Sequence, residues 1–245
     1  MAVRRDAELA GAVQAATQGH GGEVSVAVLN EADGTSASYA SGGGTYDTAS
    51  IVKVDMLAAL LLRAQDEGRT PTARERAYAT AMIESSDNDA TTALWNQLGR
   101  AEGLDAANER LGLTRTSGGD GPLWGLTQTT AADQLALLKQ VFGVGDDALA
   151  LSGESRTYVQ GLMRNVVSDQ AWGVSAAGDG GAALKNGWLP RSTTGLWVVN
   201  SVGQVTVDGR RYLVAVVSNG SVTKAAGVAL VEDVAKAAAG VVSGA

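Results

Sequence analysis

The spacing of hydrophobic residues changes along the chain from a period of two to a helical period and back. Over residues 23–30, three valines alternate with Ser, Ala and Leu, which is the pattern of a strand with two different faces. Asp33 and Gly34 form a turn signal, and residues 35–40 predict a second strand that returns beside the first.

A helical period begins at Ser50. Ile51, Val54, Leu57 and Leu61 follow one face of a helix, and a glycine and a proline end it before residue 72. Further helices are predicted at about 72–84, 88–99, 103–111, 130–142 and 152–164.

The chain becomes strand-like again near Ala182. Residues 196–202, 204–207 and 212–218 are rich in valine and aromatic residues, and Asp208-Gly209 predicts a hairpin between the last two. An alanine-rich closing helix follows at 223–239.

This order predicts an α/β fold with one antiparallel sheet formed from both chain ends, flanked by helices, and an all-helical sub-domain inserted between them. We expect a single domain over 1–245, in which 23–49 and 166–245 form the α/β part and 50–165 the mostly helical part.

Composition and charge narrow the possible functions. The chain has 245 residues, 45% of them hydrophobic, which is enough for a substantial core. Its net charge of −7 disfavours a nucleic-acid partner, because phosphate binding needs a basic surface. No apolar run reaches transmembrane length and no heptad pattern is evident, so we expect no membrane span and a monomer.

Several kinds of catalytic chemistry lack their residues. Cysteine is absent, which removes disulfides and thiol catalysis, and His20 is the only histidine and lies among glycines. We therefore expect no metal, no cofactor and no histidine-dependent triad, and a base that is Lys, Asp or Glu.

Residues 1–22 hold no hydrophobic core of the signal-peptide type. We expect an exported protein whose signal has been removed, or a cytoplasmic one if Met1 is the native start.

Three short motifs carry the candidate chemistry. Ser50 and Lys53 frame a Ser-x-x-Lys tetrad at the start of a predicted helix, where backbone N–H groups favour developing negative charge. A lysine one turn later that loses its proton near neutral pH can serve as a base. The tetrad alone is a weak signal, since Ser221 and Lys224 frame a second copy that is better explained as a helix cap. Ser86-Asp87-Asn88 and Lys185-Asn186-Gly187 follow in order, and each alone is also typical of a cap or a turn.

Together the three motifs resemble the penicillin-recognising serine enzymes, the serine β-lactamases and D,D-peptidases, over about residues 23–240. The likeness is closest to the class A β-lactamase arrangement. It implies that Ser50 is the nucleophile, that Lys53 takes its proton, and that Ser86 relays the proton to the leaving nitrogen with the help of Lys185. Asn88 would hold the substrate's amide, and the N–H groups of Ser50 and Trp188 would form the oxyanion hole. Asn186, Gly187 and Lys185 would lie against a substrate carboxylate.

The sequence departs from the class A pattern in three ways. The third motif has Asn186 where that family has Thr or Ser. No Glu lies between Thr114 and Thr130 to activate the deacylating water, and Asp120 is the only carboxylate there. The stretch between the first two motifs is short. We expect Trp124 and Trp188 to line the cleft, and Arg191 is a candidate anchor for a carboxylate, although an ordinary surface role is equally compatible with it.

The resemblance implies a serine hydrolase that forms an acyl-Ser50 intermediate on an amide, β-lactam or ester substrate bearing a carboxylate, and we expect a weak or atypical β-lactamase. Two alternatives remain open: a D,D-peptidase-like or esterase-like hydrolase acting on a small-molecule or peptide-like substrate, and a non-catalytic module that binds a β-lactam or a peptidoglycan fragment.

Overall fold

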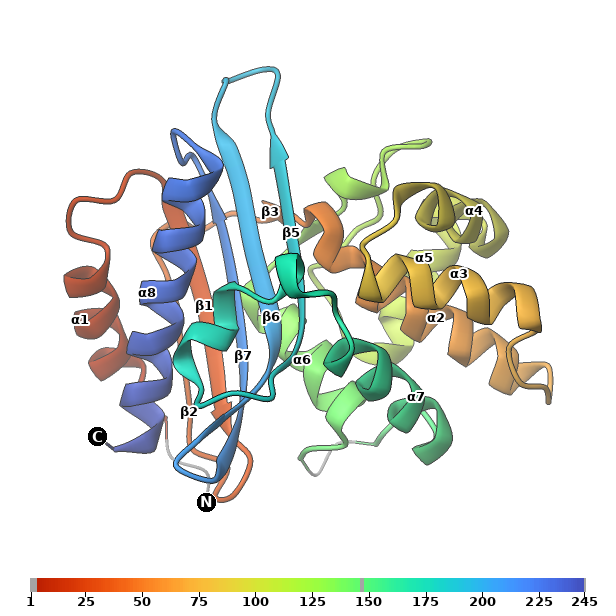
Figure 1. Cartoon of the computed structure of the whole chain (residues 1–245), viewed down its shortest axis with the longest axis horizontal. Coiled ribbons are helices and arrows are strands. Elements are labelled where there is room, and N and C mark those ends of the chain that lie inside the picture. Colours follow the sequence, from red (N-terminus) through yellow and green to blue (C-terminus); the bar gives the residue numbers. More distant parts are fainter. Residues whose placement is uncertain (1–3, 146–147, 245) are drawn as a thin grey trace.

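Strands from both ends of the chain form one antiparallel sheet in the computed structural model, which describes residues 4–145 and 148–244 (Figure 1). The strands are β1 (Glu23–Asn30), β2 (Ser36–Ala40), β3 (Tyr46–Asp47), β4 (Gln128–Thr129), β5 (Ala183–Pro190), β6 (Trp197–Val207) and β7 (Arg210–Asn219). The helices are α1 (Asp6–Ala16), α2 (Val52–Asp66), α3 (Ala73–Glu84), α4 (Asn88–Leu98), α5 (Arg100–Leu111), α6 (Ala131–Phe142), α7 (Gly153–Arg164) and α8 (Lys224–Ser243). Four 3-10 turns are η1 (Ala49–Ile51), η2 (Trp124–Leu126), η3 (Ser168–Gln170) and η4 (Gly173–Ala177).

The sheet has the strand order β2-β1-β7-β6-β5, so β5 is an edge strand. The N-terminal strand β1 pairs along its whole length with the C-terminal strand β7, from Glu23 opposite Asn219 to Asn30 opposite Tyr212. This pairing closes the sheet around the helical segment, as the sequence predicted, and the predicted fold class is confirmed.

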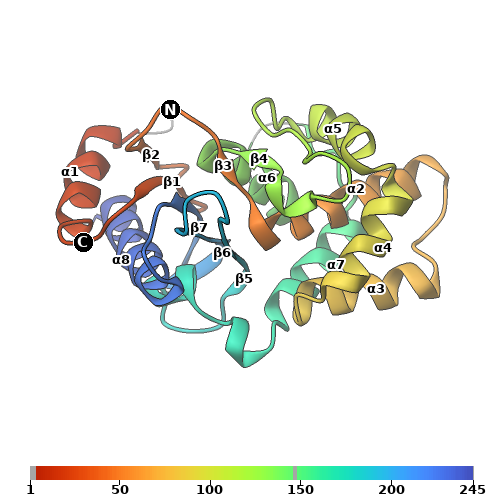
Figure 2. The same ribbon diagram turned by 90° about the horizontal axis from the view of Figure 1, so that it is seen from above.

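The alternation in β1 separates two hydrophobic cores. Its valines pack with residues of α1 and α8 on one face, and Ala27 and Leu29 belong to the core shared with α2 and the other helices. Figures 1 and 2 show α1 and α8 on one side of the sheet and α2 to α7 on the other. A strand that is buried on both faces needs apolar residues at its odd and at its even positions, and residues 23–30 have them at both.

The structure departs from the predicted elements in two places. Helix α1 was not predicted, because only Leu9 and Val13 of its residues are buried and the apolar stripe is short. The predicted break between strands at Gly203 is wrong, because β6 runs through it and β5 approaches so closely that a side chain there would collide with Ala183 O. The hairpin at Asp208 and Gly209 is as predicted, and both residues have positive φ, at 49° and 72°, as a two-residue type I′ turn requires.

Helix α2 crosses the helical half almost completely buried and carries an acidic residue inside the core. Asp55 is fully buried beside Asn108, whose amide donates to the two carboxyl oxygens at 2.8 and 3.1 Å. Burial raises the pKa of Asp55 well above its usual value; the Asn108 hydrogen bond opposes the shift, and Asp105 and Asp133 add to it. A raised folded-state pKa means that this group's stabilising contribution is complete below the unfolded pKa and is lost as the pH rises through the folded value.

We therefore expect Asp55→Asn to stabilise the fold at alkaline pH, by about 1–3 kcal/mol. At that pH the buried carboxyl must either ionise inside the core or keep a proton that the unfolded chain releases, and an amide does neither. Denaturant unfolding at a series of pH values measures the effect, with Asp66→Asn, an exposed position on the same helix, as the matched control. A difference between Asp55→Asn and the unsubstituted chain that does not change with pH would contradict this account.

Candidate active site

The candidate nucleophile lies on a tight turn. Ser50 is the middle residue of η1, so the helix predicted to begin at Ser50 starts with a 3-10 turn and becomes α-helical only at Val52. Ala49 before it has a positive φ of 46°, a conformation that costs energy for a residue other than glycine and persists only where its surroundings enforce it.

Hydrogen bonds from two directions hold this turn. Thr48 N donates to Thr127 O at 2.8 Å, beside the β3–β4 pair. From the sheet, the fully buried Asn200 of β6 donates its amide to Asp47 O and to Thr48 O, both at 2.9 Å, and its Oδ1 accepts from Ser218 N. Asn200 was missed at the sequence level, although a polar residue within the apolar run of β6 was a signal that could have identified it.

Strand β5 approaches the turn at Gly187. A methyl group at this position would lie 2.6 Å from Ser50 N and 2.8 Å from Ile51 N, so only glycine allows the two backbones to approach this closely. The glycine of the third motif therefore has a steric reason, and it places the edge strand directly against the Ser50 turn.

Lys53 points from α2 toward the second motif and is fully buried. Its Nζ donates to Ser86 O at 2.7 Å, to Ser86 Oγ at 3.0 Å and to Asn88 Oδ1 at 2.9 Å. Burial lowers the pKa of Lys53 to about 7, and the nearby charge of Asp87 opposes this shift. A substantial fraction of Lys53 is thus a neutral amine at neutral pH, which is the form that can accept a proton.

Lys185 approaches the same hydroxyl from β5. Its Nζ donates to Ser86 Oγ at 2.9 Å and to Asn186 O at 2.9 Å, and its side chain is buried. Burial lowers the pKa of Lys185 well below its usual value, and the neighbouring Lys53 lowers it further. Ser86 itself has a positive φ of 56°, so the residue between the two amines also has a strained backbone.

The second motif has a structural role and a place in the site at once. Asp87 is the N-cap of α4 and accepts from Ala90 N at 2.7 Å, which is the ordinary capping explanation for such a residue. Asn88 begins the helix and turns its Oδ1 to Lys53. The cap thus fixes the backbone from which Ser86 and Asn88 reach the lysine.

Asn186 does not lie where the sequence placed it. Its amide donates to Gln170 O at 2.7 Å and to Trp172 O at 2.9 Å, and the side chain is fully buried. Side chains alternate along a strand, so Asn186 lies on the face of β5 opposite Lys185. Both of its amide hydrogens are used within the protein, and the expectation that it contacts a substrate carboxylate is corrected to a role in holding the segment around η3 and η4.

Trp188 shares this face, and its ring packs with the α8 side of the sheet, against Trp172. Its side chain therefore lies on the face of β5 opposite Lys185, contrary to the expectation that it lines the same cleft. Arg191 likewise is not a free anchor, because its Nε lies 3.2 Å from Asp47 Oδ2.

Trp124 does lie beside the candidate base. The Lys53 Nζ is 5.0 Å from the centroid of its ring, and its own Nε1 donates to Thr92 Oγ1 at 3.3 Å. Asp120, the only carboxylate of the preceding loop, is exposed. The group next to Lys53 on this side is therefore an indole, and an indole cannot act as a base.

Comparisons with known proteins agree with this arrangement. A family model described as the β-lactamase enzyme family matches residues 68–242, a stretch that includes Ser86, Asn88 and Lys185. The chain belongs to the β-lactamase enzyme family. It is an enzyme of the β-lactamase-like serine hydrolase type.

Solved structures show the same fold. The TLA-3 extended-spectrum β-lactamase superposes with a TM-score of 0.82 at 16% identity, over 95% of this chain and 98% of that one. A class A β-lactamase from Bacteroides cellulosilyticus gives 0.81 at 16% identity, over 98% and 100% of the two chains. PBP-A gives 0.78 at 23% identity, over 96% of each chain, and a point mutant of PBP-A has been solved as an acyl-enzyme complex with penicillin G. No curated protein matches the sequence.

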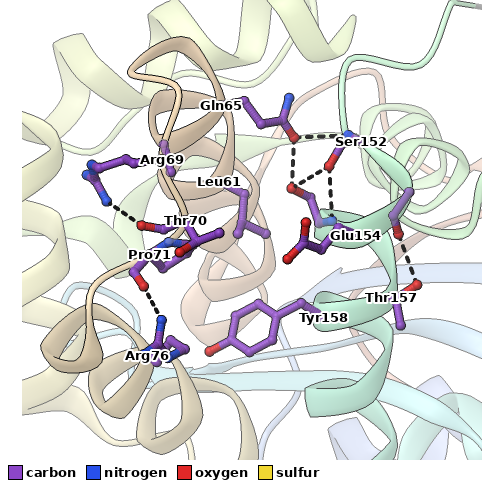
Figure 3. Close-up of a pocket in the computed structure, with 13 residues that line it drawn as sticks. Leu61, Gln65, Arg69, Thr70, Pro71, Arg76, Ser152, Glu154, Thr157 and Tyr158 are labelled. Carbon is purple, nitrogen blue, oxygen red and sulfur yellow. Dashed lines mark hydrogen bonds between the residues drawn. The ribbon is translucent and has the colours of Figure 1, made fainter.

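This β-lactamase-family chain also has a cavity of about 670 Å³ away from these residues. It lies between the C-terminal end of α2, the segment before α3, and α7, where Gln65 accepts from Ser152 N and Ser155 Oγ (Figure 3). Leu61 and Gln65 follow Lys53 by two to three helical turns, roughly 12–18 Å along α2, so this cavity is separate from the candidate active site.

Among residues 4–145 and 148–244, no group of three or more His, Asp or Glu side chains is arranged to hold a metal ion. Within the same ranges no helix combines the length and hydropathy needed to cross a membrane.

The lowered pKa of Lys53 leads to a direct spectroscopic prediction. The chain has only five lysines, so the side-chain nitrogens of a ¹⁵N-lysine-labelled sample can be followed individually. We expect one of them to titrate near pH 7, and Lys53→Arg to remove that signal while Lys236→Arg leaves it. A titration near pH 7 that persisted in Lys53→Arg and was lost in Lys185→Arg would assign the neutral amine to Lys185 and contradict its assignment to Lys53.

Proposed function

We propose that this family member is a serine hydrolase that forms an acyl-enzyme on Ser50 with an amide, β-lactam or ester substrate, and that it is a weak or atypical β-lactamase. The observation that carries the proposal is the buried Lys53, with a pKa of about 7 and its Nζ 3.0 Å from Ser86 Oγ. This amine lies one helical turn from the Ser50 hydroxyl, which needs a base to become a nucleophile.

In the proposed acylation, Ser50 Oγ attacks the substrate's carbonyl carbon and its proton passes to Lys53 Nζ. The tetrahedral intermediate collapses with cleavage of the bond to the leaving nitrogen. Ser86 gives its proton to that nitrogen and is reprotonated by Lys53, so the proton taken from Ser50 leaves with the product. Lys185 donates a hydrogen bond to the Ser86 hydroxyl and helps hold it between the two partners.

The carbonyl oxygen would accept from the backbone N–H groups of Ser50 and Trp188. Support for the second donor comes from the edge strand β5, in which Trp188 directly follows Gly187. The close contact at Gly187 brings this edge to Ser50 N.

The first test of this proposal is covalent labelling. Ser50→Ala should abolish labelling by a fluorophosphonate probe and by benzylpenicillin, because it removes the attacking oxygen. Ser221→Ala, in the second Ser-x-x-Lys tetrad, should leave labelling intact. Intact-mass spectrometry gives the readout and thermal melting verifies that both variants fold. Labelling that survives Ser50→Ala and is lost in Ser221→Ala would overturn the choice of nucleophile.

Hydrolysis of the acyl-enzyme is the step for which the site is poorly equipped. A second base must activate water, and Trp124 lies beside Lys53 while Asp120 is exposed. We expect benzylpenicillin to acylate Ser50 and to leave slowly. Trp124→Glu supplies a carboxylate next to Lys53 and should speed deacylation, by up to about 10²–10⁴-fold, the usual worth of general-base assistance.

Stopped-flow hydrolysis together with intact-mass spectrometry measures this, with Trp124→Gln as the control of similar size that cannot act as a base. Rapid steady-state hydrolysis by the unsubstituted chain, with no build-up of acyl-enzyme, would show that another group already activates the water. A slow acyl-enzyme with penicillin beside rapid release of D-alanine from a D-Ala-D-Ala peptide would favour the D,D-peptidase alternative.

A further inference from the structure

The cavity between α2, α7 and the segment before α3 has the size of a small-molecule site. Its volume of about 670 Å³ lies within the range of roughly 300–1,000 Å³ that is usual for ligand pockets. Its inner wall is apolar, because Leu61 and Ala64 of α2 are buried and the Tyr158 ring of α7 packs against the same core. Figure 3 shows Leu61 and Tyr158 facing this space from two different helices. An apolar body placed here would lose contact with water over most of its surface.

Hydrogen bonds within the walls hold the cavity in shape. On one side, Gln65 of α2 accepts from Ser152 N at 2.9 Å and from Ser155 Oγ at 2.8 Å, which ties α2 to the start of α7. On the other side, Arg69 donates to both carboxyl oxygens of the buried Glu75, at 2.8 and 3.1 Å. A ligand would therefore enter a space that already exists, and its binding would require little rearrangement of the protein.

The two arginines that line the cavity differ in how they are paired. Arg69 forms ion pairs with Glu67 and Glu75. Arg76 of α3 is exposed, and in the part of the chain that the structure describes it has no carboxylate within ion-pairing distance. The only hydrogen bond of its guanidinium among those residues runs from Nη1 to Pro71 O. A guanidinium has five N–H groups in a planar fork, so most of them remain for a ligand.

The free cation lies beside the aromatic wall. Burial raises the pKa of the Tyr158 hydroxyl; Thr80 and the charge of the nearby Arg76 oppose this shift, and the charge of Glu84 adds to it. The acidic residue that lines the cavity, Glu154, is in the first turn of α7 and is exposed, and Figure 3 shows it toward the other end of the Tyr158 ring from Arg76. An anion would therefore be drawn to the Arg76 end, with its apolar part along the ring.

We propose that this cavity is a second binding site, separate from the Ser50 turn, and that its ligand is a small aromatic carboxylate. The carboxylate accepts from the guanidinium of Arg76, a pairing that planar donors and acceptors make with two parallel hydrogen bonds. The aromatic body packs against Leu61, Ala64 and the Tyr158 ring. The site goes beyond the proposed acyl-transfer function and does not depend on it, because none of the motif residues lines the cavity.

The first test is calorimetric titration of the full chain with 2-naphthoate and with its uncharged amide, 2-naphthamide. We expect 2-naphthoate to bind with a dissociation constant of about 1 mM or lower, as is usual for a ligand of this size. Arg76→Gln should weaken its binding about five- to tenfold, the worth of one charged contact near the surface, and should leave binding of the amide unchanged.

Two matched variants control for this effect. Arg76→Lys should recover part of the affinity, and Arg74→Gln, at an exposed position on the same helix outside the cavity, should have none of the effect. Thermal melting verifies that each variant folds. No saturable binding of 2-naphthoate at millimolar concentration would overturn the site, and equal losses with acid and amide in Arg76→Gln would overturn the role of the guanidinium.

A second measurement locates the ligand. Ala64 lines the cavity, whereas Ala49 lies next to Ser50, so their methyl signals in an alanine-labelled sample report on the two places separately. We expect 2-naphthoate to shift the Ala64 signal and to leave that of Ala49 unchanged, with the same affinity in Ser50→Ala. A shift at Ala49 with none at Ala64, or loss of binding in Ser50→Ala, would place the ligand at the Ser50 turn and contradict a separate site.

Discussion

Two buried lysine amines share one hydroxyl group in this molecule, and the rest of the site depends on that arrangement. Lys53 and Lys185 both donate to Ser86 Oγ, at 3.0 and 2.9 Å, and the pKa of each is lowered. Two full positive charges at this separation in a buried site would repel strongly, so the cluster favours at least one neutral amine. That neutral amine makes a lysine usable as a base near neutral pH.

The three groups come from three parts of the chain, which links the chemistry to the docking of the two halves. Lys53 lies on α2, Ser86 on the turn before α4, and Lys185 on the edge strand of the sheet. Gly187 and Asn200 fix the contact between the sheet and the Ser50 turn, Gly187 by having no side chain and Asn200 by donating to two carbonyl groups. A small separation of the sheet from α2 would therefore disturb the proposed base, the proposed relay and the proposed oxyanion donors together.

Odd-numbered and even-numbered residues of the edge strand β5 point to opposite faces of the sheet near the site. Lys185 and Gly187 face the helical half, whereas Asn186 and Trp188 face α8. The hydrogen bond from Lys185 to Ser86 is thus on one face of β5, and the Trp172–Trp188 ring pair, with Lys224 Nζ over the Trp188 ring, is on the other. Trp124 adds a further indole on the helical side, with its ring centroid 5.0 Å from Lys53 Nζ.

The sequence by itself determined the order of most strands and helices, because alternation and helical periodicity are local properties of the chain; it missed α1, whose apolar stripe is short. It also determined the candidates Ser50, Lys53, Ser86 and Lys185, since each belongs to a short motif with a fixed spacing. Only the tertiary structure decided which partners those residues meet. The face occupied by Asn186 follows from the register of β5 on β6, and the places of Trp124, Asn200 and Lys224 follow from the packing of segments far apart in the chain. A local pattern states which residues share a face of one element, and it holds no information about which other element will cover that face.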